Sequence, residues 1–164
     1  MTRVVLGLGS NKGESRAILM HAVSDLSKVL EGMRASSLYE TAPQEYLDQK
    51  DFLNLAVSGS FTGTPEELFI HTQEIETVYG RDRAGAVSKG PRTLDIDILL
   101  FGDRIIKEKD LVIPHERMNE RQFVLIPLLE IEPECTDPSG VSYRKILSLL
   151  PDQGVRKAGS LNGK

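Results

Sequence analysis

The chain has 164 residues, of which 40% are apolar and 27% are charged, a composition typical of a folded globular protein and not of a disordered chain. Its 20 basic and 24 acidic residues give a net charge of -4 at pH 7. This balance argues against a general nucleic-acid binder, because such domains usually carry a basic face. No apolar run approaches the roughly 18 residues that a membrane-spanning helix needs.

The N-terminus and the single cysteine predict a cytoplasmic protein. The first apolar stretch gives way to Gly9-Ser10-Asn11 before the apolar core of a signal peptide is complete. Cys135 has no partner for an internal disulfide, which fits a reducing compartment. Its acidic neighbours, Glu132 and Glu134 among them, raise the pKa of a thiol, so we expect a structural cysteine and not a nucleophile.

The first half of the chain predicts three strands and two helices. Residues 3–8 form a short apolar run that predicts a buried strand. Apolar positions at spacings of three and four predict a helix that begins at Ser15 and ends before Gly32. Residues 33–41 and 52–62 are strand-like, and the polar stretch between them is long for a hairpin loop and is a candidate for ligand contact. Thr64, followed by a proline, predicts the start of a second helix that ends near residue 80.

The second half predicts one strand, a hairpin and a final helix. Residues 93–101 alternate in the manner of a strand, and the short apolar runs within residues 105–113 predict a small hairpin. Residues 123–131 are apolar, and residues 143–150 suggest a last helix. Residues 152–164 hold little apolar surface and are expected to form a loose C-terminal tail.

This order of elements predicts a single α+β domain over residues 1–151. A β-α-β-β-α-β order is that of the ferredoxin-like fold, an antiparallel sheet with helices on one face, here with an additional C-terminal hairpin and helix. The sequence contains no internal repeat and no low-complexity linker that would divide it.

Two carboxylates on the strand at residues 93–101 are the strongest chemical signal in the chain. Side chains alternate along a strand, so Asp95 and Asp97 share one face while Ile96 and Ile98 point to the other. The two Cα atoms of such a pair lie about 6.5 to 7 Å apart, which lets both side chains converge on a hard cation. Oxygen ligands of this kind select Mg²⁺, and Mg²⁺ held by one or two carboxylates is usually completed by substrate phosphates. The pair therefore predicts phosphoryl or nucleotidyl chemistry.

A basic segment directly precedes this strand. Arg81, Arg83, Lys89 and Arg92, against Asp82 alone, give residues 81–92 a net charge of +3. Its glycine and alanine residues are typical of a flexible lid that closes over an anionic ligand. Further along the chain, three more side chains could contact phosphate: His115, Arg117 and Arg121.

The usual nucleotide-binding glycine motifs do not match. The spacing of Gly7, Gly9 and Gly13 is one residue too long for the dinucleotide fingerprint. Lys12 is followed by glycine where a P-loop requires serine or threonine. Any ATP must therefore be bound in another way.

Four motifs in order resemble one known family, 6-hydroxymethyl-7,8-dihydropterin pyrophosphokinase of folate biosynthesis. They are Gly9-Ser10-Asn11, Asp51-Phe52-Leu53-Asn54, the segment from Gly90 to Leu99 (GPRTLDIDIL), and Pro114-His115 with Met118, Arg121 and residues 123–127. The resemblance covers about residues 3 to 150. It implies a ferredoxin-like fold and transfer of the β,γ-pyrophosphoryl group of ATP to the hydroxymethyl oxygen of the pterin, which releases AMP.

The resemblance also implies a set of residues for ATP and the metal. Two Mg²⁺ ions would be held by Asp95 and Asp97, which would be catalytic together with Arg83 and Arg92. The residues implied for ATP binding are Gln73, Glu76, Arg81, Arg83, Arg92, His115 and Arg121.

For the pterin, the resemblance implies a ring stacked between Phe52 and Phe123. Its edge would be read by Asn54 and by the chain from Thr41 to Gln44. The full set implied for pterin binding is Thr41, Ala42, Pro43, Gln44, Phe52, Asn54, Asp95 and Phe123. We expect a monomer whose partners are these two small molecules, with neither nucleic acid nor membrane.

Two alternatives remain open on the residues alone. The first is a non-catalytic ferredoxin-like module that binds a ligand or RNA, which should carry paired aromatic residues on its central strands and a basic face. The second is another Mg²⁺-dependent nucleotidyl or phosphoryl transferase. Release of AMP rather than ADP would distinguish pyrophosphoryl transfer from phosphoryl transfer.

Overall fold

A computed structural model describes residues 1–10, 15–41, 52–79 and 94–160. Within these residues a six-stranded sheet has the order β5-β1-β4-β3-β8, and β2 also pairs with β4. Its strands are β1 (Thr2–Ser10), β2 (Glu31–Ala35), β3 (Leu38–Thr41), β4 (Phe52–Phe61), β5 (Asp95–Phe101) and β8 (Val155–Gly159). Strands β6 (Ile106–Glu108) and β7 (Leu111–Ile113) form a separate hairpin, as predicted. The helices are α1 (Ser15–Leu26), α2 (Pro65–Tyr79), α3 (Gln122–Ile131) and α4 (Tyr143–Ser148), with a 3-10 turn at Met118–Glu120.

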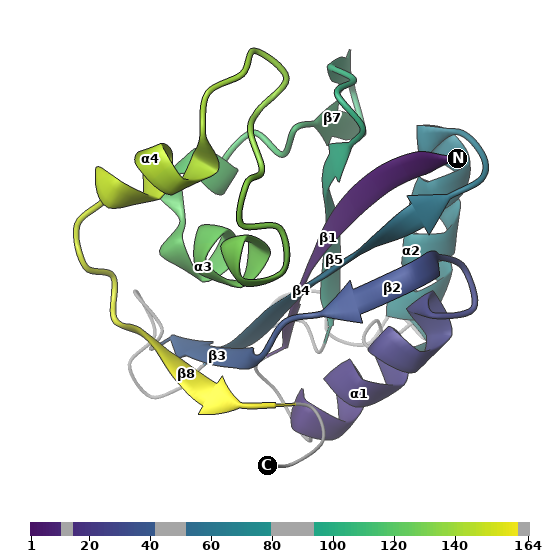
Figure 1. The fold of residues 1–164 in the computed structure, drawn as a ribbon. Helices are drawn as coiled ribbons and strands as arrows, with labels where there is room; N and C mark the ends of the chain where they lie inside the picture. The colour runs from purple at the N-terminus through teal and green to yellow at the C-terminus, as the bar shows by residue number, and fades with distance from the viewer. Residues whose placement is uncertain (11–14, 42–51, 80–93, 161–164) are drawn as a thin grey trace.

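Helices cover both faces of this sheet (Figure 1). Helices α1 and α2 pack on one face in the ferredoxin-like manner, against Val4, Leu6 and Leu8 of β1. The prediction of helices on one face only is incomplete, because α3 and α4 cover the other face. There β1 and β5 present apolar side chains such as Val5 and Leu99, which pack against α3. A strand that is apolar on both faces needs a layer on each side.

The two ends of the second helix agree with the sequence prediction. The Thr64 hydroxyl accepts a hydrogen bond from the Glu67 N–H at 3.1 Å, and the Glu67 carboxylate accepts one from the Thr64 N–H at 2.7 Å. This reciprocal capping box satisfies two N–H groups at the start of α2.

The first helix is shorter than predicted: it ends at Leu26, and residues 27–30 continue as turns before Gly32, whose φ is 60°.

The strand predicted over residues 33–41 is divided in two. Strands β2 and β3 both pair with β4 and are separated by Ser36 and Ser37. The Ser36 hydroxyl accepts a hydrogen bond from the Ala56 N–H at 2.9 Å, so the break remains attached to β4. Ser37 donates hydrogen bonds to the carboxylate of Glu130, which lies on α3. The break is therefore where α3 is fastened to the sheet.

The prediction of a loose tail is wrong for residues 155–159. These residues form β8, which pairs with β3 in a register that places Val155 opposite Thr41 and Arg156 opposite Glu40. The segment has little apolar pattern, and it is ordered by pairing with the open edge of β3. Local sequence does not reveal such pairing. Among the described residues, no helix has both the length and the apolar character to cross a membrane.

Candidate active site

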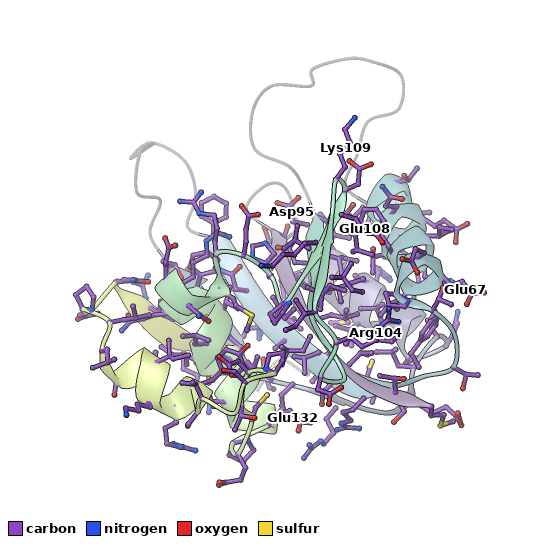
Figure 2. All side chains as sticks on the ribbon, turned by 90° about the horizontal axis from the view of Figure 1, so that it is seen from above. Glu67, Asp95, Arg104, Glu108, Lys109 and Glu132 are labelled. Atoms are coloured by element: carbon purple, nitrogen blue, oxygen red, sulfur yellow. The ribbon has the colours of Figure 1, made fainter. Side chains whose placement is uncertain are left out.

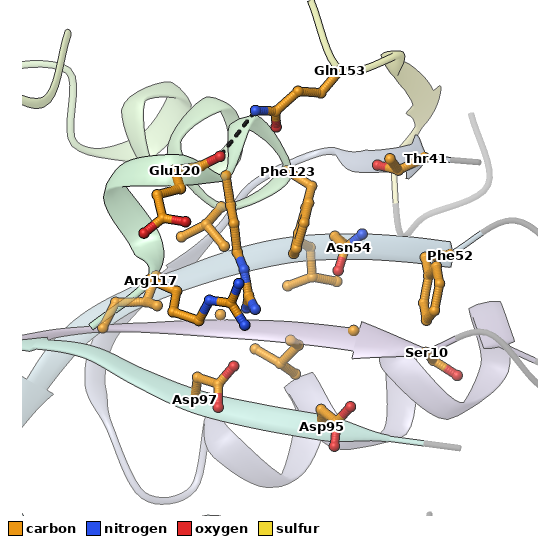
Figure 3. Close-up of a pocket in the computed structure, with 17 residues that line it drawn as sticks. Ser10, Thr41, Phe52, Asn54, Asp95, Asp97, Arg117, Glu120, Phe123 and Gln153 are labelled. Atoms are coloured by element: carbon orange, nitrogen blue, oxygen red, sulfur yellow. Dashed lines mark hydrogen bonds between the residues drawn. The ribbon is translucent and has the colours of Figure 1, made fainter. Parts of the chain in front are cut away.

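A pocket of about 460 Å³ opens at one end of the sheet, between the strands and the start of α3 (Figure 3). Its floor is formed by the ends of β1, β4 and β5, and one wall by the turn and first residues of α3. Asp95 marks this end of the molecule, and Glu132 lies at the opposite end (Figure 2). Apart from the residues outside the described part of the chain, most of the residues predicted for the site meet here.

Two glycines of β1, Gly7 and Gly9, line the pocket and leave room for neighbouring side chains. Gly9 lies between Asn54 and Asp95 in the register of the sheet. A Cβ atom at Gly9 would stand 2.7 Å from Oδ1 of Asn54, closer than real Cβ contacts allow. At Gly7 the added atom would meet the flexible end of Leu99 at 3.3 Å. The glycine at position 9 therefore leaves the space that the Asn54 side chain occupies.

The two acids of β5 share one face, as the alternation predicts. Asp95 and Asp97 are exposed and line the pocket, whereas Ile96 and Ile98 are buried on the side of α2. The Oδ2 atom of Asp97 lies 3.8 Å from Nε2 of His115. The structure thus brings the His115 imidazole close to the paired carboxylates, although His115 is not among the described residues that line the pocket.

The donor set of this carboxylate pair fits Mg²⁺ better than a transition metal. No group of three or more His, Cys, Asp or Glu side chains in the described part of the chain is arranged to hold a metal by itself. Asp95 and Asp97 supply hard carboxylate oxygens and leave the remaining positions of an octahedron to water and phosphate oxygens, which is how Mg²⁺ is usually bound. The residues present therefore fit a metal that arrives with a nucleotide.

Cationic groups line the wall opposite β5. Arg117 and Arg121 both face the pocket, and the guanidinium carbon of Arg121 lies 5.4 Å from the ring centroid of Phe123. The Nδ1 atom of His115 accepts a hydrogen bond from the Arg117 N–H at 3.2 Å, which turns Nε2 towards Asp97. The backbone N–H of His115 donates to the Leu99 carbonyl at 3.1 Å, so this loop is attached to β5.

Aromatic rings stand on either side of Asn54. Phe52 comes from β4 and Phe123 from α3, and both project into the pocket (Figure 3). Phe52 is 36% exposed, so part of its ring is open to a ligand. The Thr41 hydroxyl also lines the pocket, is buried, and has no hydrogen-bond partner in the described structure. These four residues form what we call the aromatic end of the pocket.

Two predicted nucleotide-binding residues lie elsewhere. Gln73 is exposed on α2, and Glu76 is buried beneath β5; neither is among the described residues that line the pocket. The remaining predicted residues lie outside the described part of the chain, as does the predicted lid at 81–92. They are Ala42, Pro43, Gln44, Arg81, Arg83 and Arg92.

The structure adds pocket residues that sequence reasoning missed. Glu120 and Val124 are adjacent in sequence to the predicted residues Arg121 and Phe123, and only this adjacency could have indicated that they line the pocket. Gln153 comes from the segment expected to form a loose tail, so nothing in its local sequence could have indicated it. Cys135, in contrast, behaves as predicted: burial, and secondly Glu132, raise the pKa of its thiol to about 11.

Comparisons with known proteins identify the family of this chain. The family model of 7,8-dihydro-6-hydroxymethylpterin-pyrophosphokinase (HPPK) matches residues 5–133. The 2-amino-4-hydroxy-6-hydroxymethyldihydropteridine pyrophosphokinase of Aquifex aeolicus is 37% identical over 157 residues, which cover 96% of this chain and 95% of that protein. The protein of the same name from Bacillus subtilis is 46% identical over 128 residues, or 77% of this chain and 75% of that one.

A solved structure supports the fold. The wild-type HPPK-DHPS of Plasmodium falciparum superposes with a TM-score of 0.71 at 19% identity, over 90% of this chain and 44% of that longer one. At this identity the likeness concerns the fold alone, and it confirms the ferredoxin-like prediction. The family model and the two bacterial relatives confirm the resemblance that the motifs indicated: the chain belongs to the 7,8-dihydro-6-hydroxymethylpterin-pyrophosphokinase family.

Proposed function

We propose that the pocket described above is where this chain performs the reaction of its family. That reaction is ATP-dependent transfer of a pyrophosphoryl group to 6-hydroxymethyl-7,8-dihydropterin, a step of folate biosynthesis. The observation that carries the assignment to this pocket is the meeting of three kinds of group in one cavity. Paired carboxylates, arginine side chains and two aromatic rings all line it.

In the proposed arrangement Asp95 and Asp97 hold two Mg²⁺ ions that enter with ATP. Bound there, the ions would neutralise the phosphate oxygens and make the β-phosphorus more electrophilic. The two carboxylates lie on the same face of β5, and the half-buried His115 at 3.8 Å from Asp97 limits the space beside them.

The aromatic end is proposed to bind the pterin. A flat heterocycle gains most from stacking on ring faces, which Phe52 and Phe123 offer from two sides. The Asn54 amide carries both donors and an acceptor, which suits the edge of a pterin ring. The buried Thr41 hydroxyl, which has no hydrogen-bond partner among the described residues, would gain one from the pterin. Ala42, Pro43 and Gln44 follow it in the chain and complete the proposed set.

The arginines are proposed to bind the phosphates. Arg121 and Arg117 face the carboxylates across the pocket, so the phosphates of a bound ATP would lie between the two walls. His115, which lies beside Asp97, is also proposed to contact the phosphates. From the family motifs, Arg81, Arg83 and Arg92 are proposed to contact the phosphates and to stabilise the charge that develops as AMP leaves. Gln73 and Glu76 remain proposals for the nucleotide on the same ground.

In the proposed step the pterin hydroxymethyl oxygen forms a bond to the β-phosphorus, and the bond from that phosphorus to the α-phosphate oxygen breaks. The chain contributes by holding the two reactants close and aligned. No covalent enzyme intermediate is needed, which agrees with the raised pKa of the Cys135 thiol. We further propose that the protein acts as a cytoplasmic monomer on these small molecules, without nucleic acid.

The test is product analysis with purified protein, ATP, Mg²⁺ and 6-hydroxymethyl-7,8-dihydropterin. We expect equal amounts of AMP and pterin diphosphate, and no AMP when the pterin is left out. Formation of ADP would indicate a simple phosphoryl transferase. No product above a protein-free control would contradict the assignment. Phe123→Ala should raise the KM for the pterin more than that for ATP, which locates the pterin at the aromatic end.

A further inference from the structure

The start of α3 lacks a cap from its own sequence. The first N–H groups of a helix have no partner within it and are usually satisfied by the side chain of the residue before the helix. Here that residue is Arg121, whose backbone is extended and whose side chain makes no capping hydrogen bond. Arg121 and Phe123, whose side chains line the pocket, directly precede and follow Gln122, the first residue of α3.

Gln153 supplies the missing cap from 31 residues away in the sequence. Its side-chain oxygen accepts a hydrogen bond from the Gln122 N–H at 2.8 Å, and the Gln122 side chain accepts one from the Gln153 N–H at 2.8 Å. The Gln153 amide nitrogen donates to the Glu120 carbonyl at 2.9 Å, the bond drawn in Figure 3. Three hydrogen bonds thus fix the turn that carries Arg121 and Phe123.

The same segment is attached to the opposite wall of the aromatic end. Two residues after Gln153, β8 begins and pairs with β3, with Val155 opposite Thr41. Arg156 adds an ion pair with Glu40 at 2.9 Å, which is largely exposed and contributes little energy. Gln153 itself lines the pocket, as does Thr41. The segment from Gln153 to Gly159 therefore joins the α3 wall and the β3 wall.

We infer that Gln153 is a positioning residue for pterin binding: it holds the first turn of α3 so that Phe123 and Arg121 stand ready in the pocket. The inference rests on the proposed function, since it assumes that the pterin occupies the aromatic end. Without the cap, the first turn of α3 is ordered only part of the time, and the apparent affinity of a ligand that needs the ordered turn falls by that fraction. Loss of one helix cap corresponds to a factor of about five.

The variant that tests this is Gln153→Met, which keeps the length of the side chain and removes both polar atoms. We expect the KM for the pterin substrate to rise by about fivefold while kcat changes by less than about twofold. Gln153→Glu keeps an acceptor for the Gln122 N–H but loses the donor to Glu120. Its KM for the pterin should therefore lie between those of the original protein and Gln153→Met. The matched control is Arg156→Gln, in the same segment but outside the pocket, with a KM like that of the original protein.

A second readout does not depend on the pterin. Amide hydrogen exchange at Gln122 and Phe123 should be faster in Gln153→Met by a similar factor, and unchanged in Arg156→Gln. A lower melting temperature with an unchanged KM and unchanged exchange would show that Gln153 is only structural, and would overturn the inference. If the original protein neither binds nor converts the pterin, the proposed function fails instead, and unchanged exchange would still refute the capping role.

Discussion

The carboxylate of Glu76 accepts a hydrogen bond from the backbone N–H of Ile96 at 2.8 Å. Ile96 stands between Asp95 and Asp97 on β5, which pairs with β1 alone among the described strands. The outer edge of β5 therefore receives its partner from a helix side chain that is only 7% exposed. Glu76 fixes the course of the strand at the residue between the two proposed metal ligands.

Replacement of Glu76 should impair turnover through the position of β5. We expect Glu76→Met to lower kcat by roughly tenfold or more, because small displacements of reacting groups are costly. It should also lower the free energy of unfolding by about 1–3 kcal/mol, because the Ile96 N–H loses its partner. Glu76→Gln keeps an acceptor oxygen and should retain most of both. Steady-state kinetics and urea unfolding measure these effects, and a Met variant with normal kcat would refute the role.

Removal of either acid of β5 should abolish turnover without unfolding the protein. We expect Asp95→Ala and Asp97→Ala to lower kcat by at least about a hundredfold, because each removes a proposed Mg²⁺ ligand. Stability should be kept or slightly raised, since the repulsion between two neighbouring carboxylates is relieved. Asp103→Asn, an exposed acid beyond the end of β5, is the matched control. Near-normal activity of either alanine variant would exclude the metal assignment.

A methyl group at Gly9 should disturb pterin binding. The added Cβ would lie 2.7 Å from the Asn54 side chain, which must then move. We expect Gly9→Ala to raise the KM for the pterin by roughly tenfold or more, the cost of losing one or two hydrogen bonds at a buried edge. Gly7→Ala meets only the flexible end of Leu99 at 3.3 Å and should have a smaller effect. Equal KM values for the two variants would argue against Asn54 as a pterin contact.

Stability should fall in acid partly through Glu132. Burial opposes ionisation of this carboxyl, but hydrogen bonds from Arg3, Ser58 and Arg34 outweigh it and lower its pKa below the usual 4.5. Because the pKa is lower in the folded state, the stabilisation is complete above about pH 4.5 and is lost as the pH falls through the folded-state value. It amounts to less than about 1 kcal/mol, since the Arg3 and Arg34 side chains are 43% and 55% exposed.

Urea unfolding between about pH 3 and pH 6 checks this prediction. In Glu132→Gln the decline in unfolding free energy below about pH 4.5 should be shallower than in the original protein. Glu134→Gln, a nearby exposed acid, should leave the slope unchanged. If the unfolding free energies of Glu132→Gln and of the original protein decline in parallel as the pH falls, the proposed contribution of Glu132 to acid stability is wrong.

The parts of the site that the sequence could predict are those encoded by local periodicity. Alternation along one strand was enough to place Asp95 and Asp97 on a common face, and the Thr64 cap marked the start of α2 correctly. The rings of Phe52 and Phe123 come from elements far apart in the chain, and only the family resemblance indicated that they would meet.

The parts that could not be predicted depend on contacts between distant segments. Gln153 caps a helix across 31 residues, and β8 is ordered by the open edge of β3 and not by apolar periodicity. At the break between β2 and β3, Ser37 donates hydrogen bonds to Glu130 of α3. No local pattern encodes such pairings, because each partner is an ordinary polar residue in its own segment.

Intact transfer of a pyrophosphoryl group from ATP to the pterin is the step on which the proposed roles of the pocket residues depend. The most direct measurement follows ATP labelled with ³²P at the β-phosphate, incubated with the protein, Mg²⁺ and 6-hydroxymethyl-7,8-dihydropterin. We expect all transferred label to appear in the pterin product and the released AMP to be unlabelled. Label retained in ADP, with a pterin that carries a single phosphate, would refute pyrophosphoryl transfer.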